Sequence, residues 1–416
     1  MTREKPAGPA AEAQVDPRLL VREKGFAGYL GEFRRRIKGG ELGPLPVIIG
    51  LVVIWIVFQT LNDRFLSPQN LSNLSVDIVA TGLISVGIVF VLLLGEIDLS
   101  AGAVSGACAA VLAVLSVGQG WDPLPSMIVA VAVGAAMGLF HGFFFAKIGV
   151  PSFVVTLAGM LAWTGFQLWV LGPNGTINLP DGLISSLTDT YFAYVIAAYL
   201  LAAAATAGFL LVSLVGNARR RAAGVPSRTV GDIVFRTAVL AVVAFGVAYV
   251  LNLYRGLPLA LLIFLAVVVV TDFVQRRTKY GRSIFAVGGN IEAARRAGIN
   301  VAFIRMSVFA ISGAFAALGG IFAASRISSA SQATGQSNVL MMAIAAAVIG
   351  GTSLFGGRGS AYSALLGMLV IQSIASGMAL QGVSNAIQFI VTGAVLLAAV
   401  VIDSVSRRSQ KASGRA

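Results

Sequence analysis

The sequence predicts an all-α, polytopic integral membrane protein with about twelve transmembrane helices and with both termini in the cytoplasm. The chain of 416 residues is 57% hydrophobic and only 11% charged, whereas about 25% of the residues in an ordinary soluble domain are charged. Its mean hydropathy is +0.87, and its 48 glycines suit helices that pack closely in lipid. These observations exclude a water-soluble globular fold.

Residues 1–43 are expected to form a cytoplasmic tail. They contain no continuous apolar stretch of the roughly 7 to 15 residues found in a cleaved signal peptide, so no cleavable signal is expected. In the second half of this tail, apolar residues recur at helical spacing among arginines and lysines. This pattern predicts a short basic helix on the inner membrane surface, with a solvated basic run as the alternative. The apolar residues are Phe26, Tyr29, Leu30, Phe33 and Ile37.

Residues 44–403 form the predicted transmembrane domain, and residues 404–416 form a cytoplasmic C-terminal tail. Twelve apolar runs are long enough to cross, or nearly cross, about 30 Å of hydrocarbon. A proline suited to the first helical turn marks several starts, at Ser67-Pro68, Asp122-Pro123 and Pro151-Ser152. The runs are approximately 44–61, 76–95, 99–118, 124–146, 152–171, 189–215, 233–254, 257–274, 303–324, 339–356, 360–379 and 385–403.

The placement of the basic residues predicts the orientation, because cytoplasmic loops are enriched in Lys and Arg. With the N-terminus inside, 27 of the 30 lysines and arginines fall in inner segments. Only Arg64, Arg255 and Arg326 fall outside. The basic connection between residues 275 and 305 is therefore expected in the cytoplasm. The net charge of +13 reflects this asymmetry and does not indicate nucleic-acid binding.

The longest inner connection carries a short capped helix. Asn290 suits the N-cap, Glu292 lies in the first turn, and Gly298 suits the position just beyond the last turn. Arg295 and Arg296 lie in the last turn, where positive charge is favourable. A helix of about two turns is marginal in water by itself. We therefore expect it to be stabilised by docking against a partner, because its alanines would allow a partner to approach closely. An ordinary capped loop helix is the alternative.

Two acids, Glu96 and Asp98, lie near the membrane boundary in the segment GEIDLSAG, between the second and third runs. Acids at such positions tend to be paired, hydrated or functional. Two interpretations remain open: Asp98 or Ser100 caps the next helix at a tight interfacial turn, or the acids line a translocation path. Residues 350–364 share five identities with this region at an offset of 255 residues. Each of the two segments is either a loop or a broken helix.

Uncharged polar and aromatic side chains within the runs suit a hydroxylated, uncharged solute, which needs hydrogen bonds and flat apolar faces. Alternatively, each of them bonds one helix to another or anchors it at the interface. His141 has no Cys, Asp or Glu beside it in the sequence, so a metal or proton-relay role is not favoured. Cys108 is expected to be a buried thiol. The candidate translocation-path residues are Glu96, Asp98, Trp163, Gln167, Gln372 and Gln388.

The sequence contains no GxxxxGK[ST] phosphate loop and no connection long enough for an enzyme domain. No catalytic residue, metal or cofactor is predicted, and any ATP must be bound by another polypeptide. The spans also lack a nucleophile–base pair or a metal-ligand cluster for an intramembrane enzyme. A self-contained secondary transporter of a small solute is the alternative, because major facilitator proteins share this layout. Those proteins normally have a basic loop after the second span, whereas the loop here is short and acidic.

Several sequence blocks resemble one transport family. Glu292-Ala293-Ala294 with Gly298 resembles the EAA-xxx-G signature of permease subunits in binding-protein-dependent ABC importers, although the leucine-proline ending of the broader signature is absent. The strings AVGGNIEAARRAGINV, GEIDLSAG, VPSFVVTLAGM and VIGGTSLFGGRGS resemble the branch that imports ribose, xylose and related monosaccharides. Twelve runs favour the longer, xylose-type permeases.

The resemblance implies a transport subunit of the bacterial inner membrane that moves a monosaccharide, xylose or a related sugar, by ATPase-driven alternating access. Residues 275–302 become the coupling loop, whose short helix docks in a groove of the ATPase subunit. The implied partners are a cytoplasmic ABC ATPase, a periplasmic sugar-binding protein, a second permease copy and membrane lipid. The coupling residues are Glu292, Ala293, Ala294 and Gly298 from the signature, with Arg282, Arg295 and Arg296 added from charge and position.

Overall fold

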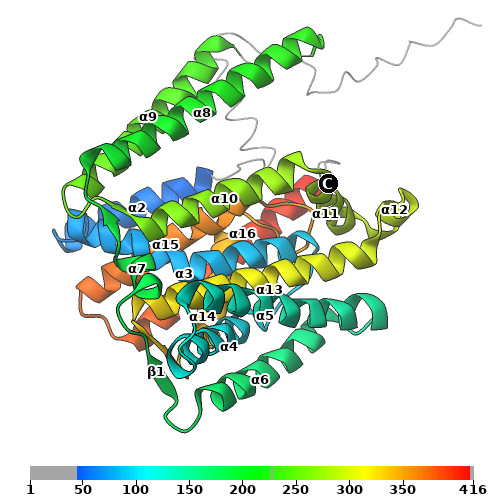
Figure 1. Ribbon diagram of the computed structural model, residues 1–416. Coiled ribbons are helices and arrows are strands. Elements are labelled where there is room, and N and C mark those ends of the chain that lie inside the picture. The colour runs from blue at the N-terminus through cyan, green and yellow to red at the C-terminus, as the bar shows by residue number, and fades with distance from the viewer. Residues whose placement is uncertain (1–44, 226, 228, 413–416) are drawn as a thin grey trace, which may run out of the picture. The chain divides into compact units, whose positions relative to one another are not determined.

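The computed structural model describes residues 45–412, apart from residues 226 and 228, and most of these residues are helical (Figure 1). The expected N-terminal tail with its basic helix, residues 1–43, lies outside the described residues. The described chain folds as two compact units. The smaller contains residues 201–246, and the larger contains residues 45–200 and 247–412.

The first part of the chain contains the following elements. They are α2 (Leu45–Leu61), α3 (Pro68–Leu93), α4 (Ala101–Ala113) with a π-helical end (Val114–Gly118), α5 (Pro123–Phe143) with a π-helical end (Phe144–Ile148), α6 (Ser152–Leu171), β1 (Thr176–Asn178), α7 (Leu183–Asp189), β2 (Tyr191–Phe192), α8 (Val195–Ala222) and α9 (Val230–Asn252). The remaining elements are β3 (Leu257–Pro258), α10 (Leu259–Arg277), α11 (Lys279–Gly289), α12 (Ile291–Arg296), α13 (Val301–Arg326), β4 (Ser329–Ser331), α14 (Ser337–Ile349), α15 (Ala361–Leu380) and α16 (Asn385–Ala412).

Within the described residues, nine helices are long and apolar enough to cross a membrane. They coincide in order with nine of the twelve predicted runs. At the other three predicted runs the structure has shorter apolar helices, which are Leu45–Leu61, Asn338–Ile349 and Asn385–Ala398. The all-α membrane fold is therefore confirmed with nine helices of spanning length. The proline signals are also confirmed, because α3, α5 and α6 begin at Pro68, Pro123 and Ser152.

The smaller unit is a hairpin built from α8 and α9. Its helices expose large apolar side chains such as Leu211, Val212, Val242 and Val243. This is the surface expected of helices surrounded by lipid, where nearly every face is apolar.

In the larger unit, α3 forms the centre and contacts α4, α10, α13, α14 and α15. Of its most apolar 18-residue window, 83% is buried, which explains why its sequence is apolar on every side. The helix begins at Pro68, and the Ser67 side chain accepts a hydrogen bond from the Asn70 N–H. The predicted run began at residue 76, so α3 is two turns longer than expected at its start.

Helices α5 and α13 form a seam of small residues. A side chain at Gly138 would collide with the Phe309 carbonyl, and one at Gly134 would lie 2.5 Å from the Gly313 carbonyl. Gly313 is equally close to the Gly134 carbonyl from the other side. Glycine therefore lets the two helix backbones touch, as small residues do in membrane proteins.

We expect Gly138→Leu to destabilise the protein by about 1–3 kcal/mol or more, because the added side chain forces α5 away from α13. The matched control is Gly165→Leu on α6, where nothing lies within 4 Å of an added Cβ. The measurement is the thermal unfolding midpoint of the purified protein in detergent. Equal midpoints for the two variants would contradict the packing of this seam.

The larger unit has two distinct ends, as Figure 1 shows. At one end, here called the α12 end, lie α11, α12 and the start of α13. At the opposite end, the β4 end, β4 pairs antiparallel with β1 through Thr176 with Ser331 and Asn178 with Ser329. A second antiparallel pair, β2 with β3, also lies there.

Candidate functional site: the α12 surface and the polar segment Leu94–Ser100

Helix α12 has the caps expected from its sequence. The Asn290 side chain accepts a hydrogen bond of 2.9 Å from the Ala293 N–H. At the other end, Gly298 has a φ of +79°, and the Ile299 N–H returns to the Ala294 carbonyl at 3.1 Å. A left-handed residue with this returning bond is the usual glycine stop of a helix. The predicted helix is therefore confirmed, with Ala297 as its C-cap residue.

The predicted coupling residues divide by exposure. Ala294 is buried, at 3% exposure, and holds the helix against the protein. Glu292 and Arg295 form an exposed ion pair of 3.0 Å, which contributes little stability. The face that α12 presents to solvent is thus small and mixed in charge. Its exposed members, with one from α11, are Arg282, Glu292, Ala293, Arg295, Arg296 and Gly298.

Helix α11, which the sequence analysis did not predict, fixes α12 to the bundle. The Tyr280 hydroxyl bonds the Ser307 hydroxyl of α13 at 2.8 Å. Burial raises the pKa of Tyr280 above its usual value, against the opposing effect of this hydrogen bond, so the phenol stays neutral. At the end of α11, a Cβ on Gly288 would collide with the Leu93 carbonyl at the end of α3. The coupling loop thus contacts the central helix directly.

The segment Leu94–Ser100 is non-helical and turns into the bundle between α3 and α4. Asp98 is only 3% exposed, and the Ser312 hydroxyl donates to its Oδ2 at 2.9 Å. Ser312 lies eleven residues into α13, or roughly 16 Å along its axis. The connection is therefore a break between helices that reaches the interior of the bundle, rather than an interfacial turn.

The capping interpretation is wrong for Ser100. Ser100 occupies the N-cap of α4 but forms no side-chain cap. Instead, Asp98 Oδ1 accepts from the Ser100 N–H at 2.9 Å and from the Ser100 hydroxyl at 2.6 Å. The carboxylate thus stabilises the turn that precedes α4.

His141 extends this cluster. The Trp163 indole donates to His141 Nε2 at 2.9 Å, and His141 Nδ1 lies 3.2 Å from the Ser100 hydroxyl. Because an indole only donates, Nε2 is the acceptor and the neutral ring carries its hydrogen on Nδ1. The chain of donors then runs from Trp163 through His141 and Ser100 to the Asp98 carboxylate. Ser100 is fully buried and already donates to Asp98, so this arrangement provides no exposed nucleophile.

Glu96 links the same segment to α6 and to the start of α13. Its Oε2 accepts from the Ser152 hydroxyl at 2.7 Å, and its Oε1 lies 3.7 Å from Arg305 Nη2. Arg305, at the start of α13, also stacks over the Phe145 ring at 4.3 Å. Burial raises the pKa of Glu96, and the bonds to Ser152 and Arg305 oppose that effect. Glu96 is therefore a paired acid that connects the segment Leu94–Ser100 to α6 and α13.

The other expected path residues do not join this cluster. Gln167 is buried, and its Nε2 donates to the carbonyls of Ser331 and Thr334 at 2.9 and 3.0 Å. Gln372 is a half-buried residue of α15. Gln388 donates to the nearby Val383 carbonyl at 2.9 Å. Of the six, the structure brings Asp98 and Trp163 into one cluster, with Glu96 on the adjoining segment.

The second glycine-rich segment lies against the first. Residues 350–360 are non-helical, and the Gly357 N–H donates to the Leu93 carbonyl at 2.9 Å. A Cβ at Gly356 would lie 2.9 Å from the Gly95 nitrogen and 2.7 Å from the Gly288 carbonyl. The two segments and the end of α11 therefore meet at one point of the α12 end.

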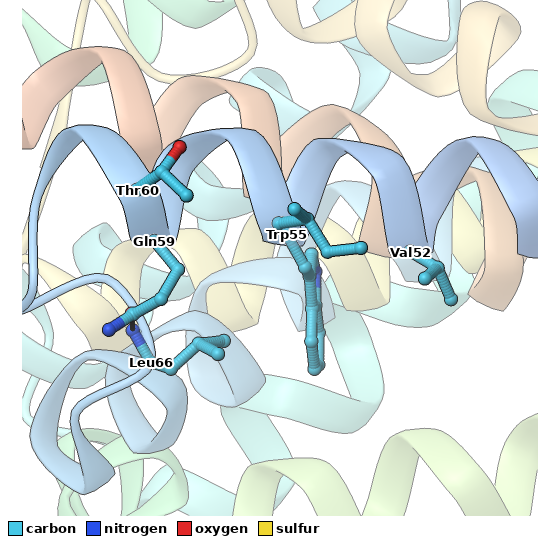
Figure 2. A pocket seen from close by; sticks show the side chains of 6 residues that line it. Val52, Trp55, Gln59, Thr60 and Leu66 are labelled. Atoms are coloured by element: carbon cyan, nitrogen blue, oxygen red, sulfur yellow. Dashed lines mark hydrogen bonds between the residues drawn. The ribbon is translucent and has the colours of Figure 1, made fainter.

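A shallow apolar groove of about 330 Å³ lies on the outer face of α2. Figure 2 shows Val52, Trp55 and Gln59 projecting from one side of the helix into this groove, with Leu66 at its end. Trp55 also donates to the Ser373 hydroxyl of α15 at 2.9 Å, which fixes the indole. The groove offers apolar surface and few polar partners.

No group of His, Cys, Asp and Glu within the described residues has the arrangement of a metal site. Cys108 is fully buried, as expected.

Comparison with known proteins identifies the family. Residues 70–400 match the family described as the permease component of branched-chain amino acid transport systems. The chain is 38% identical to the xylose transport system permease protein XylH of Escherichia coli K12, covering 89% of this chain and 94% of that protein. It is 36% identical to XylH of Haemophilus influenzae, covering 90% and 99%, and 31% identical to the ribose import permease RbsC of Bacillus subtilis, covering 87% and 92%.

No solved structure matches the chain. The match nevertheless extends over nearly the whole bundle, from the start of α3 to the middle of α16. It therefore includes the coupling loop and both glycine-rich segments. The chain belongs to this family of ABC transport permeases: it is a multi-pass membrane protein and a transport component rather than an enzyme.

Proposed function

We propose that this chain is the permease subunit of an ABC importer for a monosaccharide, xylose or a closely related sugar. The observation that carries the proposal is the similarity to xylose permeases over about nine-tenths of the chain. The match to a ribose permease supports the same substrate class at lower identity. The family description names branched-chain amino acids, so a hydrophobic amino acid is the competing substrate.

The α12 end faces the cytoplasm in this proposal, with both termini on the same side. The support is the charge distribution, since 27 of the 30 lysines and arginines fall in segments assigned to that side. The β4 end then faces the periplasm of a bacterial inner membrane, where a sugar-binding protein delivers the substrate. Residues 1–43 and 404–416 serve as cytoplasmic tails, although residues 404–412 continue α16.

A cytoplasmic ATPase supplies the energy by docking on the exposed face of α12. The contact is made by the exposed residues Glu292, Ala293 and Gly298, together with Arg282, Arg295 and Arg296. The buried Ala294 anchors the helix to the protein. Movement of α12 reaches the bundle by two contacts: Gly288 against the Leu93 carbonyl, and Arg305 with Glu96. A second copy of the chain completes the permease. Membership of an ABC permease family argues against the self-contained secondary transporter.

Reconstitution tests the proposal. Proteoliposomes that contain this chain, its ATPase and its binding protein should accumulate labelled xylose or ribose only when ATP is supplied to the α12 side. Leucine serves as the competing substrate. Sugar accumulation driven by a proton or sodium gradient without the ATPase would reject the ABC mechanism, and ATP-driven uptake of leucine alone would reject the sugar.

A further inference from the structure

A cavity of about 280 Å³ opens at the β4 end of the larger unit. It lies between α3, α4, α7, α13 and the turn that precedes α14. Partly exposed Asp77 and Arg326 mark its mouth, together with the exposed Ile327, while the buried Ser105 and Thr334 form its floor. The cavity is separate from the α12 surface and from the Asp98 cluster.

An ion pair at the mouth is its main polar feature. Arg326 Nε of α13 lies 2.9 Å from Asp77 Oδ1 of α3, and each side chain is about one-third exposed. Asp77 is nine residues into α3, or roughly 14 Å along its axis. Arg326 is the last residue of α13, so the pair lies where that helix ends, at the β4 end of the bundle. Charged groups on membrane helices are costly, and a paired, partly exposed acid and base mark a candidate functional site. The hydrogen bond within the pair uses Arg326 Nε and Asp77 Oδ1. Among the described residues, this leaves the second carboxylate oxygen of Asp77 as an acceptor, and the terminal N–H groups of Arg326 as donors, for a ligand.

The size and lining of the cavity suit one small polyol. At about 30 Å³ per water molecule, its volume corresponds to roughly nine waters. That is enough space for a five- or six-carbon sugar. The residues that line the cavity include Thr81 and Ser105, which carry hydroxyl groups, and Phe322, which carries an apolar ring. A sugar presents vicinal hydroxyls that match a carboxylate and a guanidinium, and an apolar C–H face that matches a ring.

The floor of the cavity is held by a residue expected in the translocation path. Gln167 donates to the Ser331 and Thr334 carbonyls and so fixes the turn that closes the cavity. Below this turn, Gly102 and Gly106 of α4 allow close backbone approach, since a Cβ on Gly106 would collide with the Thr334 carbonyl. Gln167 therefore acts as a positioning residue for the floor and does not line the cavity itself.

We propose that this cavity binds one monosaccharide within each permease protomer at the β4 end, and that Asp77 and Arg326 bind neighbouring sugar hydroxyls. The inference rests on the proposed sugar-importing function. It adds the residues that would recognise the substrate inside the membrane subunit.

Cysteine protection tests the site directly. Because Cys108 is fully buried, Thr81→Cys introduces an accessible thiol into the cavity, and a membrane-impermeant maleimide should label it from the β4 side. Xylose or ribose should slow this labelling at least about tenfold, while leucine should not. The matched control is Asp181→Cys, an exposed position that does not line the cavity, where sugar should leave the labelling rate unchanged.

A second experiment measures uptake in the complete importer. The double variant Asp77→Asn with Arg326→Gln removes both charges together, so that neither is left buried and unpaired. We expect sugar uptake at a fixed subsaturating concentration to fall at least about tenfold, while the amount of protein in the membrane stays the same. Asp63→Asn with Arg64→Gln, exposed charges outside the cavity, is the control and should leave uptake unchanged.

The outcomes separate the two proposals. Suppose that the unmodified importer takes up sugar, that sugar does not slow the labelling of Thr81→Cys, and that uptake does not change in the double variant. The cavity is then not the sugar site, and the proposed importer function stands. If the unmodified importer takes up no monosaccharide, the proposed function itself is rejected. If leucine, and not sugar, slows the labelling of Thr81→Cys, a sugar is rejected as the substrate in both the proposed function and the proposed cavity site.

Discussion

Gly298→Pro is expected to abolish sugar uptake while leaving the protein in the membrane. Gly298 has a φ of +79°, and its N–H donates to the Arg295 carbonyl at 3.0 Å. Proline fixes φ near −65° and has no N–H, so the end of α12 must rearrange. A misplaced proline costs about 3 kcal/mol or more, which corresponds to a change of about 100-fold in a binding constant. The ATPase should therefore fail to dock on the altered surface.

The matched control is Gly382→Pro. Gly382 follows α15 with a φ of +68°, and its N–H donates to the Ala379 carbonyl at 3.0 Å, so the backbone conflict is the same. It lies away from the coupling loop, and uptake should fall much less. Uptake, membrane level and co-purification of the ATPase are measured together. Normal uptake and normal co-purification for Gly298→Pro would reject the coupling role of α12.

Glu292→Lys tests the same surface without touching the backbone. The exposed Glu292–Arg295 pair contributes about 0–1 kcal/mol to stability, so the variant should fold normally. Reversing this charge should nevertheless weaken ATPase binding, if the residue lies in the contact. An unchanged ATPase affinity would remove Glu292 from the interface.

The capped helix could be predicted because its determinants are local. Asn290 and Gly298 act on neighbours within four residues, and such short-range bonds depend on the sequence directly. Helix α11 was missed although it has a local start signal too, since the Thr278 hydroxyl accepts from the Gly281 N–H at 3.1 Å. It is held by contacts of Tyr280 with Ser307 and of Gly288 with the end of α3, which connect distant parts of the chain.

The acid Asp77 was overlooked because of a boundary error. The predicted run began at residue 76, so Asp77 was its second residue. The signal at Ser67-Pro68 was present in the sequence, and α3 does begin there. That start places Asp77 well inside the helix, opposite Arg326, a residue 249 positions away. No periodicity or motif predicts such a pairing, because it depends on how α3 and α13 pack.

Asp98→Ala is expected to lower the free energy of unfolding by about 3 kcal/mol or more. The carboxylate is 3% exposed and accepts from the Ser100 N–H, the Ser100 hydroxyl and the Ser312 hydroxyl. Removing it leaves these buried donors without their acceptor, at about 1–3 kcal/mol for each unsatisfied group. Unfolding of the purified protein in detergent, followed by heat or denaturant, measures the loss.

The control is Asp122→Ala, because Asp122 also precedes a helix but forms no side-chain cap and is exposed. Its effect should stay within about 0.5 kcal/mol. Asp98→Asn then separates structure from transport, because the amide oxygen can still accept from Ser100 while the negative charge is lost. A stable Asp98→Asn protein with normal uptake would assign the cluster to the fold alone. A stable protein with lost uptake would show that the charge itself serves transport. If Asp98→Ala unfolds at the same temperature or denaturant concentration as the wild type, these hydrogen bonds do not hold the α3–α4 break in place.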